Sequence, residues 1–367
     1  MVYTTEQIKN MRQELNQKIQ SDFNKCTTYS EKLGYIIKVV LMSQQEYMKY
    51  TNNMFLTEDY CLQLLKELNE MPEMDDSKFI DFVQDKIIKP MNAGHLYIKQ
   101  SKTIETEELI AAREKYMLEH KEELEKNKNI EINFLNDKST VVVKIKSFSR
   151  QYLEEDRKIL KDLEQHLSSN DYDNVVIDIR ENTGGTDEYF ELLSMFSSKP
   201  VFKRDNYRNL LTGENESVEW MAINGTGKDY NRYLLVDDKV FSTSESLTML
   251  CKNTGFATVI GEPTRGEGYG ATPFVLNISN SVYTGRHMNS LEKKVGLNLV
   301  FPIEAPINAM GEIDYANFYR IIPDIICPSE EALEVALNQI EHNQSITKWY
   351  RFINDFRSDL LWKPRDL

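Results

Sequence analysis

Apolar residues recur at helical spacing through the first quarter of the chain. The spacing predicts helices over residues 6–19 and 29–55, followed by two shorter helices before Pro90. The last two open on Thr57 and Asp76, which suit the start of a helix. Because no strand pattern interrupts this region, we expect residues 1–91 to form an N-terminal helical domain.

The pattern changes to alternating strands and helices from Ile130 onward. Short apolar runs predict strands at 141–145, 175–179, 233–236 and 257–260, and amphipathic segments predict helices at 152–167, 188–196 and 244–252. This alternation is typical of an α/β fold with parallel strand pairing. Further β-structure is expected at 274–278 and 297–301. We therefore expect an α/β core over 92–340, with a charged helical insertion at about 102–128, and a helical tail over 341–367.

Composition and charge narrow the classes of function. The 367 residues are 41% apolar, enough for a folded core, and carry a net charge of -14. An acidic surface repels phosphate backbones, so we do not expect a nucleic-acid partner. The sequence has no stretch of about 20 apolar residues and no signal-peptide pattern, so we expect no membrane span and a cytoplasmic location, unless a leader was removed earlier. The four cysteines form no CxxC pair and no ligand cluster is visible, so no metal or organic cofactor is expected.

Four polar segments are candidates for chemistry. The turn at 178–185 leaves a buried strand and ends in Gly184 and Gly185, whose backbone N–H groups could face an anion or simply form a tight turn. Ser242 precedes a helix, a position that suits a nucleophile and equally a capping residue. A glycine-rich loop with two carboxylates and one guanidinium covers 261–270, and His95 follows a glycine at the junction of the two expected domains. Spacing alone does not decide whether these segments form a functional site or are only a turn, a helix cap and a surface loop.

Taken in order, these segments resemble the serine peptidase family that includes the C-terminal-processing peptidases and the tricorn core. Its motifs D-x-R-x-N-x-G-G, S-x-S-E, V-G-E-x-T-x-G-x-G and P-D-I are matched at 178–185, 242–245, 260–268 and 323–325. The resemblance covers roughly residues 93–338. It implies a Clp-protease/crotonase-like α/β core behind an N-terminal helical unit.

The resemblance also implies roles for individual residues. Processing peptidases use a Ser-Lys pair, but Glu267 stands at the lysine position here, and Gly94-His95 matches the histidine of the tricorn-like branch. It thus implies Ser242 as nucleophile, His95 as general base and Glu267 as the acid that orients it. The oxyanion would be held by the N–H of Thr243 and one N–H from Gly184 or Gly185. Arg180 is expected to pair with nearby carboxylates.

The expected function is hydrolysis of peptide bonds in a peptide or protein substrate. About 45 residues separate His95 from the strand at 141, too few for a PDZ-like peptide-binding domain. Two alternatives stay open: a catalytically silent relative that binds peptides or other ligands, and an esterase with the same nucleophile. The oligomeric state is not predicted.

Overall fold

The chain forms two compact units, each built from three stretches of sequence. The computed structural model describes residues 2–51, 56–91, 93, 96–100, 128–135, 139–266, 273–279, 297–302, 304–307, 310–312 and 320–343. The first unit comprises 1–128, 203–220 and 266–320, and the second comprises 129–202, 221–265 and 321–367. The three-part division that we expected, 1–91, 92–340 and 341–367, stays a prediction.

The first unit contains the expected N-terminal helices. These are α1 (Thr5–Asn24), α2 (Tyr29–Thr51), α3 (Glu58–Glu70) and α4 (Asp76–Val83), the last continuing through a π-turn (Gln84–Ile88) into α5 (Lys89–Met91). The side chains of Thr57 and Asp75 accept the backbone N–H groups of Tyr60 and Lys78 and so cap α3 and α4. Among the described residues, the helices that we predicted in this region are therefore present.

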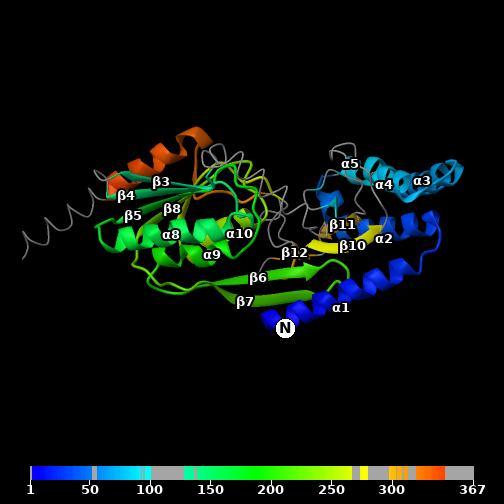
Figure 1. The fold of residues 1–367 in the computed structure, drawn as a ribbon, viewed down its shortest axis with the longest axis horizontal. Helices are drawn as coiled ribbons and strands as arrows, with labels where there is room; N and C mark the ends of the chain where they lie inside the picture. The colour runs from blue at the N-terminus through cyan, green and yellow to red at the C-terminus, as the bar shows by residue number, and fades with distance from the viewer. Residues whose placement is uncertain are drawn as a thin grey trace, which may run out of the picture. The chain divides into compact units, whose positions relative to one another are not determined.

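A three-stranded antiparallel sheet packs with these helices. It has the order β10 (Pro273–Ser279), β11 (Leu297–Pro302) and β2 (Tyr97–Gln100). Leu276, Leu299 and Phe301 share one buried apolar cluster with residues of α2 and α4. The strands expected at 274–278 and 297–301 are therefore present, and they complete the core of the helical unit (Figure 1).

A second sheet has the order β1 (Val2–Tyr3), β7 (Asn215–Ile223), β6 (Val201–Asn209) and β12 (Glu304–Pro306). The expectation that the N-terminal region contains no strand was wrong, because Val2 and Tyr3 pair in parallel with Ser217 and Val218. The sequence did not predict β6 and β7 either. Their buried positions include Lys203 and Glu216, so the apolar alternation that marks a strand is broken.

The second unit is built on a six-stranded sheet. Its order is β13 (Ile325–Ile326), β9 (Thr258–Gly261), β8 (Asn231–Val236), β5 (Asn174–Asp178), β4 (Thr140–Ile145) and β3 (Ile130–Leu135). All neighbours are parallel except β3, which runs antiparallel to β4. This confirms the α/β fold with parallel pairing.

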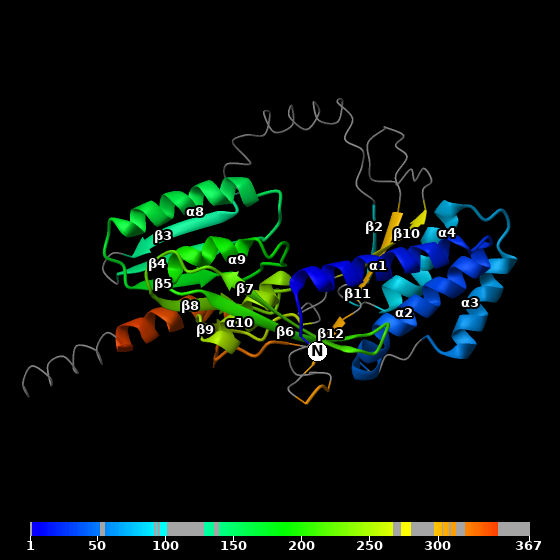
Figure 2. The same cartoon turned by 90° about the horizontal axis from the view of Figure 1, so that it is seen from below.

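Helices cover both faces of the six-stranded sheet. The helices α8 (Leu153–Ser168) and α9 (Tyr189–Leu192, continuing as a 3-10 turn, Leu193–Phe196) lie on one face, and the helical residues 332–343 lie on the other (Figures 1 and 2). Ala332, Ala336 and Ile340 pack there against β4, β5, β8 and β9. Because both faces are covered, β5 is buried along its whole length, which explains its continuous apolar sequence.

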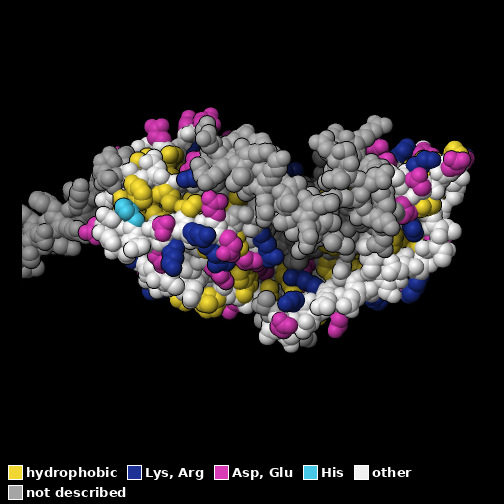
Figure 3. Space-filling view, viewed as in Figure 1, with side chains coloured by type: hydrophobic (Ala, Val, Ile, Leu, Met, Phe, Trp, Pro, Cys, Tyr) yellow, Lys and Arg dark blue, Asp and Glu magenta, His cyan; other side chains and the backbone are white. Residues whose placement is uncertain are grey.

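The described surface mixes both signs of charge. On the face drawn in Figure 3, basic and acidic side chains are interspersed. In the part of the chain that the structure describes, no helix is long and apolar enough to cross a membrane.

Candidate active site

The candidate site lies at the carboxyl ends of β5 and β8. These neighbouring parallel strands end at Asp178 and Val236, so the segments that follow them leave from the same edge of the sheet. The N–H of Glu181 donates to both carboxylate oxygens of Asp237 at 3.0 Å. The N–H of Phe241 donates to the carbonyl of Asn182 at 3.2 Å. The glycine turn and the serine segment are thus joined by one backbone–side-chain contact and one backbone–backbone hydrogen bond.

Ser242 has a backbone conformation that L-residues avoid. It precedes α10 (Thr243–Thr254) and has φ 59° and ψ -125°. A residue that only caps a helix has no need of this conformation: Thr4, which caps α1, has φ -75° and ψ 157°. Positive φ at a non-glycine residue costs of order 1–3 kcal/mol and is concentrated at functional sites. The capping role alone therefore does not explain how Ser242 is held.

Gly184 and Gly185 lie where a side chain has no room. A Cβ added to Gly184 would lie 2.7 Å from the carbonyl oxygen of Phe241 and 2.8 Å from both Ser242 Cβ and Thr243 N. A Cβ added to Gly185 would lie 2.0 Å from the carbonyl oxygen of Phe148. The hydroxyl of Thr243 also donates to the carbonyl of Gly185 at 2.9 Å. The structure therefore brings together the predicted nucleophile and the three residues predicted as oxyanion donors.

Two of the four backbone N–H groups at this place are already used. The N–H of Gly184 donates to Asn182 Oδ1 at 2.9 Å, and that of Ser242 donates to Glu245 Oε2 at 3.2 Å. Among the hydrogen bonds of the described residues, the N–H groups of Gly185 and Thr243 have no acceptor. These two groups are therefore the candidates for binding an incoming anion.

Asn182 connects the glycine turn at 178–185 to the serine segment at 242–245. Its side chain is fully buried, donates to the carbonyl of Ile145 at 2.9 Å and accepts the hydroxyl of Ser244 at 2.8 Å. The same oxygen accepts the N–H of Gly184. The sequence marked Asn182 and Ser244 only as motif positions, and the structure shows that they are one hydrogen-bonded pair.

Arg180 is paired as expected. Its guanidinium donates to both oxygens of Asp178, at 2.9 and 2.6 Å, and to the carbonyl of Ser329 at 2.6 Å. Sequence reasoning missed Asp237, whose carboxylate also accepts the N–H groups of Lys239 and Val240 at 3.1 Å. The available signal was an aspartate directly after a strand, since such residues often accept N–H groups two and three positions on.

The predicted base and acid, His95 and Glu267, lie outside the described residues. Both stay predictions from the sequence. In the described ranges, no group of three or more His, Cys, Asp or Glu side chains could hold a metal ion.

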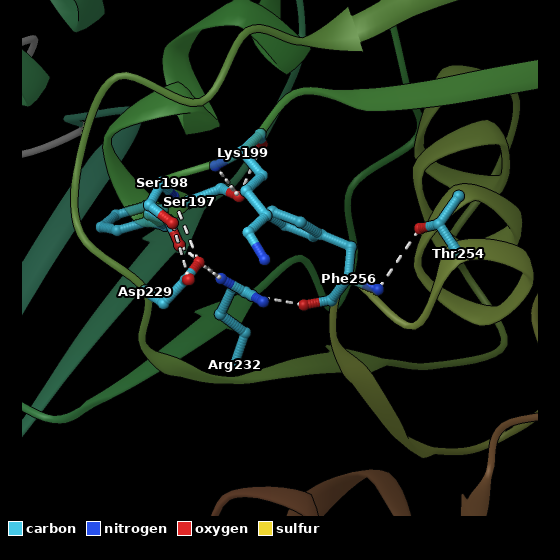
Figure 4. Close-up of polar contacts among 8 residues, drawn as sticks. Ser197, Ser198, Lys199, Asp229, Arg232, Thr254 and Phe256 are labelled. Atoms are coloured by element: carbon cyan, nitrogen blue, oxygen red, sulfur yellow. Dashed lines mark hydrogen bonds and ion pairs between the residues drawn. The ribbon is translucent and has the colours of Figure 1, made fainter.

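A second polar cluster lies at the opposite end of β8 (Figure 4). Arg232 donates to the carbonyls of Phe256 at 2.5 Å and Phe196 at 2.7 Å and contacts Asp229 at 3.4 Å, and its guanidinium lies 4.7 Å from the Phe256 ring centre. Asp229 in turn accepts the Ser198 hydroxyl at 2.7 Å. Since these groups bind one another, we assign the cluster a structural role.

Residues 139–301 match the model of peptidase family S41. Similar solved structures include a lipoprotein from Streptococcus agalactiae, with a TM-score of 0.55, 15% identity, and coverage of 86% of this chain and 97% of that chain. A candidate peptidase from Parabacteroides merdae has a TM-score of 0.51, 13% identity and coverage of 86% and 97%. Mature CPAF has a TM-score of 0.53, 10% identity and coverage of 86% and 96%. At these identities the likeness shows a shared fold.

Proposed function

We propose, from the match of residues 139–301 to the model of peptidase family S41, that this chain hydrolyses peptide bonds through a covalent acyl-enzyme on Ser242. The observation that carries the proposal is the backbone of Ser242, held at φ 59° beside two N–H groups without an acceptor among the described residues. A strained serine between a strand and a helix, next to such donors, is an arrangement that serves nucleophilic acyl transfer in α/β-hydrolases.

In the proposed mechanism, Ser242 Oγ attacks the carbonyl carbon of the scissile bond while its proton passes to His95. The tetrahedral intermediate collapses when the histidine returns that proton to the leaving amine, and the acyl group stays on Ser242 as an ester. Water, deprotonated by the same histidine, then attacks the ester carbonyl; the bond to Ser242 Oγ breaks, the histidine returns the proton to that oxygen, and the acid leaves. Glu267 orients and charge-balances the imidazole. The roles of His95 and Glu267 rest on the sequence resemblance.

The oxyanion donors can be assigned more narrowly than from the sequence. Because the N–H of Gly184 is used by Asn182 and that of Ser242 by Glu245, we assign the role to Thr243 and Gly185. Thr243 is the first residue of α10, so its N–H lies at the positive end of the helix dipole. Loss of one oxyanion donor typically lowers the rate by about 10²–10³.

The substrate class is a peptide or protein. The cytoplasmic location expected from the sequence stays a prediction. One structural relative is described as a lipoprotein.

The proposal is tested by labelling the full chain with a fluorophosphonate probe and measuring intact mass. We expect a single adduct on the wild type and none on Ser242→Ala. His95→Ala should label far more slowly, and the wild-type rate should rise through pH ~6–7 as the histidine loses its proton. No adduct on folded wild type, or an adduct that survives in Ser242→Ala, would refute the nucleophile.

Further measurements on the same protein distinguish this proposal from the esterase and from the catalytically silent relative. Normal labelling of His95→Ala would refute only the role of His95 as general base. Turnover of esters without turnover of peptides would favour the esterase. Peptide binding without labelling would favour the catalytically silent relative.

A further inference from the structure

A buried carboxylate lies directly behind the proposed nucleophile. Glu245 is fully buried in the first turn of α10. Its Oε2 accepts the backbone N–H of Ser242 at 3.2 Å, and its Oε1 accepts the hydroxyl of Thr264 at 2.7 Å. A buried charge is costly unless it is well bonded, so its presence at this position calls for an explanation.

The hydrogen-bond directions require an acceptor at both oxygens of Glu245. Thr264, also fully buried, accepts the N–H of Ile321 on its hydroxyl oxygen at 2.9 Å. The hydroxyl hydrogen is therefore left for Glu245, and the other carboxylate oxygen faces an N–H. An ionised carboxylate meets both donors, whereas an amide presents a donor at one of the two positions.

Glu245 and the helix together fix both backbone groups of Ser242. The carboxylate binds the N–H, while the carbonyl of Ser242 accepts the N–H groups of Glu245 at 2.9 Å and Ser246 at 3.1 Å. The φ and ψ angles of Ser242 are thereby constrained from both sides. Constraint of this kind is what maintains a strained conformation.

Thr264 extends the link to the loop after β9. The loop runs along the serine segment, since Glu262 N–H donates to the carbonyl of Val236 at 3.3 Å and Arg265 N–H to that of Val240 at 3.0 Å. The side-chain bond between Thr264 and Glu245 connects this loop to the helix that carries Ser242.

We propose that Glu245 is a positioning residue, and that its carboxylate, aligned by Thr264, holds Ser242 at the angle from which its hydroxyl reacts. The proposal rests on the assigned role of Ser242 and deepens it. Glu245 acts through the backbone of Ser242, so its loss should lower kcat and the labelling rate while leaving KM nearly unchanged. A carboxylate that only capped the helix would affect stability and leave the reaction of the folded protein intact.

The test compares Glu245→Gln, Thr264→Val and Thr264→Ser in the full chain. Thr248→Val is the matched control, because Thr248 is equally buried in α10 but its hydroxyl donates to the carbonyl of Ser244 at 2.8 Å. Fluorophosphonate labelling rates, kcat and KM on a peptide substrate, and hydrogen exchange of the Ser242 amide are measured at one pH. A shift of 1 Å at a reacting group can cost about 10²-fold, so we expect losses of about 10- to 100-fold in Glu245→Gln and Thr264→Val.

Rescue by the conservative variant separates the hydroxyl from packing. Thr264→Ser keeps the hydroxyl and should react within about twofold of the wild type, as should Thr248→Val. The Ser242 amide should exchange faster in Glu245→Gln and Thr264→Val only. Wild-type labelling and exchange in both of these variants would overturn the proposal, as would an equal loss in Thr264→Ser and Thr264→Val. If the wild type does not label, the proposed function fails, and the amide exchange still decides whether Glu245 holds Ser242.

Discussion

Replacing Gly184 with alanine tests the contact between the glycine turn and the nucleophile. The added Cβ would lie 2.7–2.8 Å from three atoms of residues 241–243, two of which belong to the backbone. Such distances are well inside van der Waals contact, so the turn, the serine segment or both must move. The backbone of Gly184 also has φ 92°, which alanine adopts at a cost of about 1–2 kcal/mol.

The expected size of the effect follows from these two terms. Steric crowding in a packed region costs about 1–3 kcal/mol in addition to the backbone strain. We therefore expect Gly184→Ala to lower the free energy of unfolding by about 2–5 kcal/mol. Since the displaced groups include Ser242 and Thr243, the labelling rate of the protein that remains folded should fall by about 10²-fold or more.

Gly255→Ala is the matched control. Gly255 ends α10 with φ 68°, and an added Cβ there meets nothing within 4 Å. In this variant the free energy of unfolding should fall by only about 1–2 kcal/mol, from backbone strain, and labelling should proceed at the wild-type rate. Urea unfolding and fluorophosphonate kinetics on both variants give the comparison. Equal stability losses together with wild-type labelling in Gly184→Ala would refute the close approach of Gly184 to Ser242.

Two further predictions follow from the second unit. Ser242→Gly should abolish labelling yet raise the free energy of unfolding by about 1 kcal/mol, because glycine adopts φ 59° without strain; a loss of stability in urea unfolding would contradict this. Burial raises the pKa of Asp156, whose carboxylate accepts hydrogen bonds from Tyr189 and Asn129, both at 2.5 Å. The native state therefore binds a proton more readily than the unfolded chain. The stability of the wild type relative to Asp156→Asn should rise as the pH falls from neutral towards the ordinary value of 3.8. A difference that stays constant over this pH range in urea titrations would refute the assignment.

The sequence alone determined the strand–helix alternation and the position of the serine. The run 175–179 is apolar except at Asp178, because β5 is covered on both faces of the sheet. A short apolar run of this kind indicates a buried strand from the sequence alone. Ser242 could likewise be named as a candidate, since a small hydroxyl residue before a helix is a local pattern, but only the ordered set of family motifs implied its role as nucleophile. Neither prediction needed knowledge of which segments meet in space.

Tertiary structure decided what each polar residue does. The bonds from Asn182 to Ser244, from Glu245 to Thr264, and from Asp237 to the N–H of Glu181 join residues up to 62 positions apart, and no periodicity reports such pairs. The strands β6 and β7 were missed for the same reason: buried Glu216 is tolerated because Asn209 on the neighbouring strand donates to it at 3.2 Å. Apolar burial follows local pattern because it is non-directional, whereas a buried polar group depends on one specific partner, and only the folded chain supplies it.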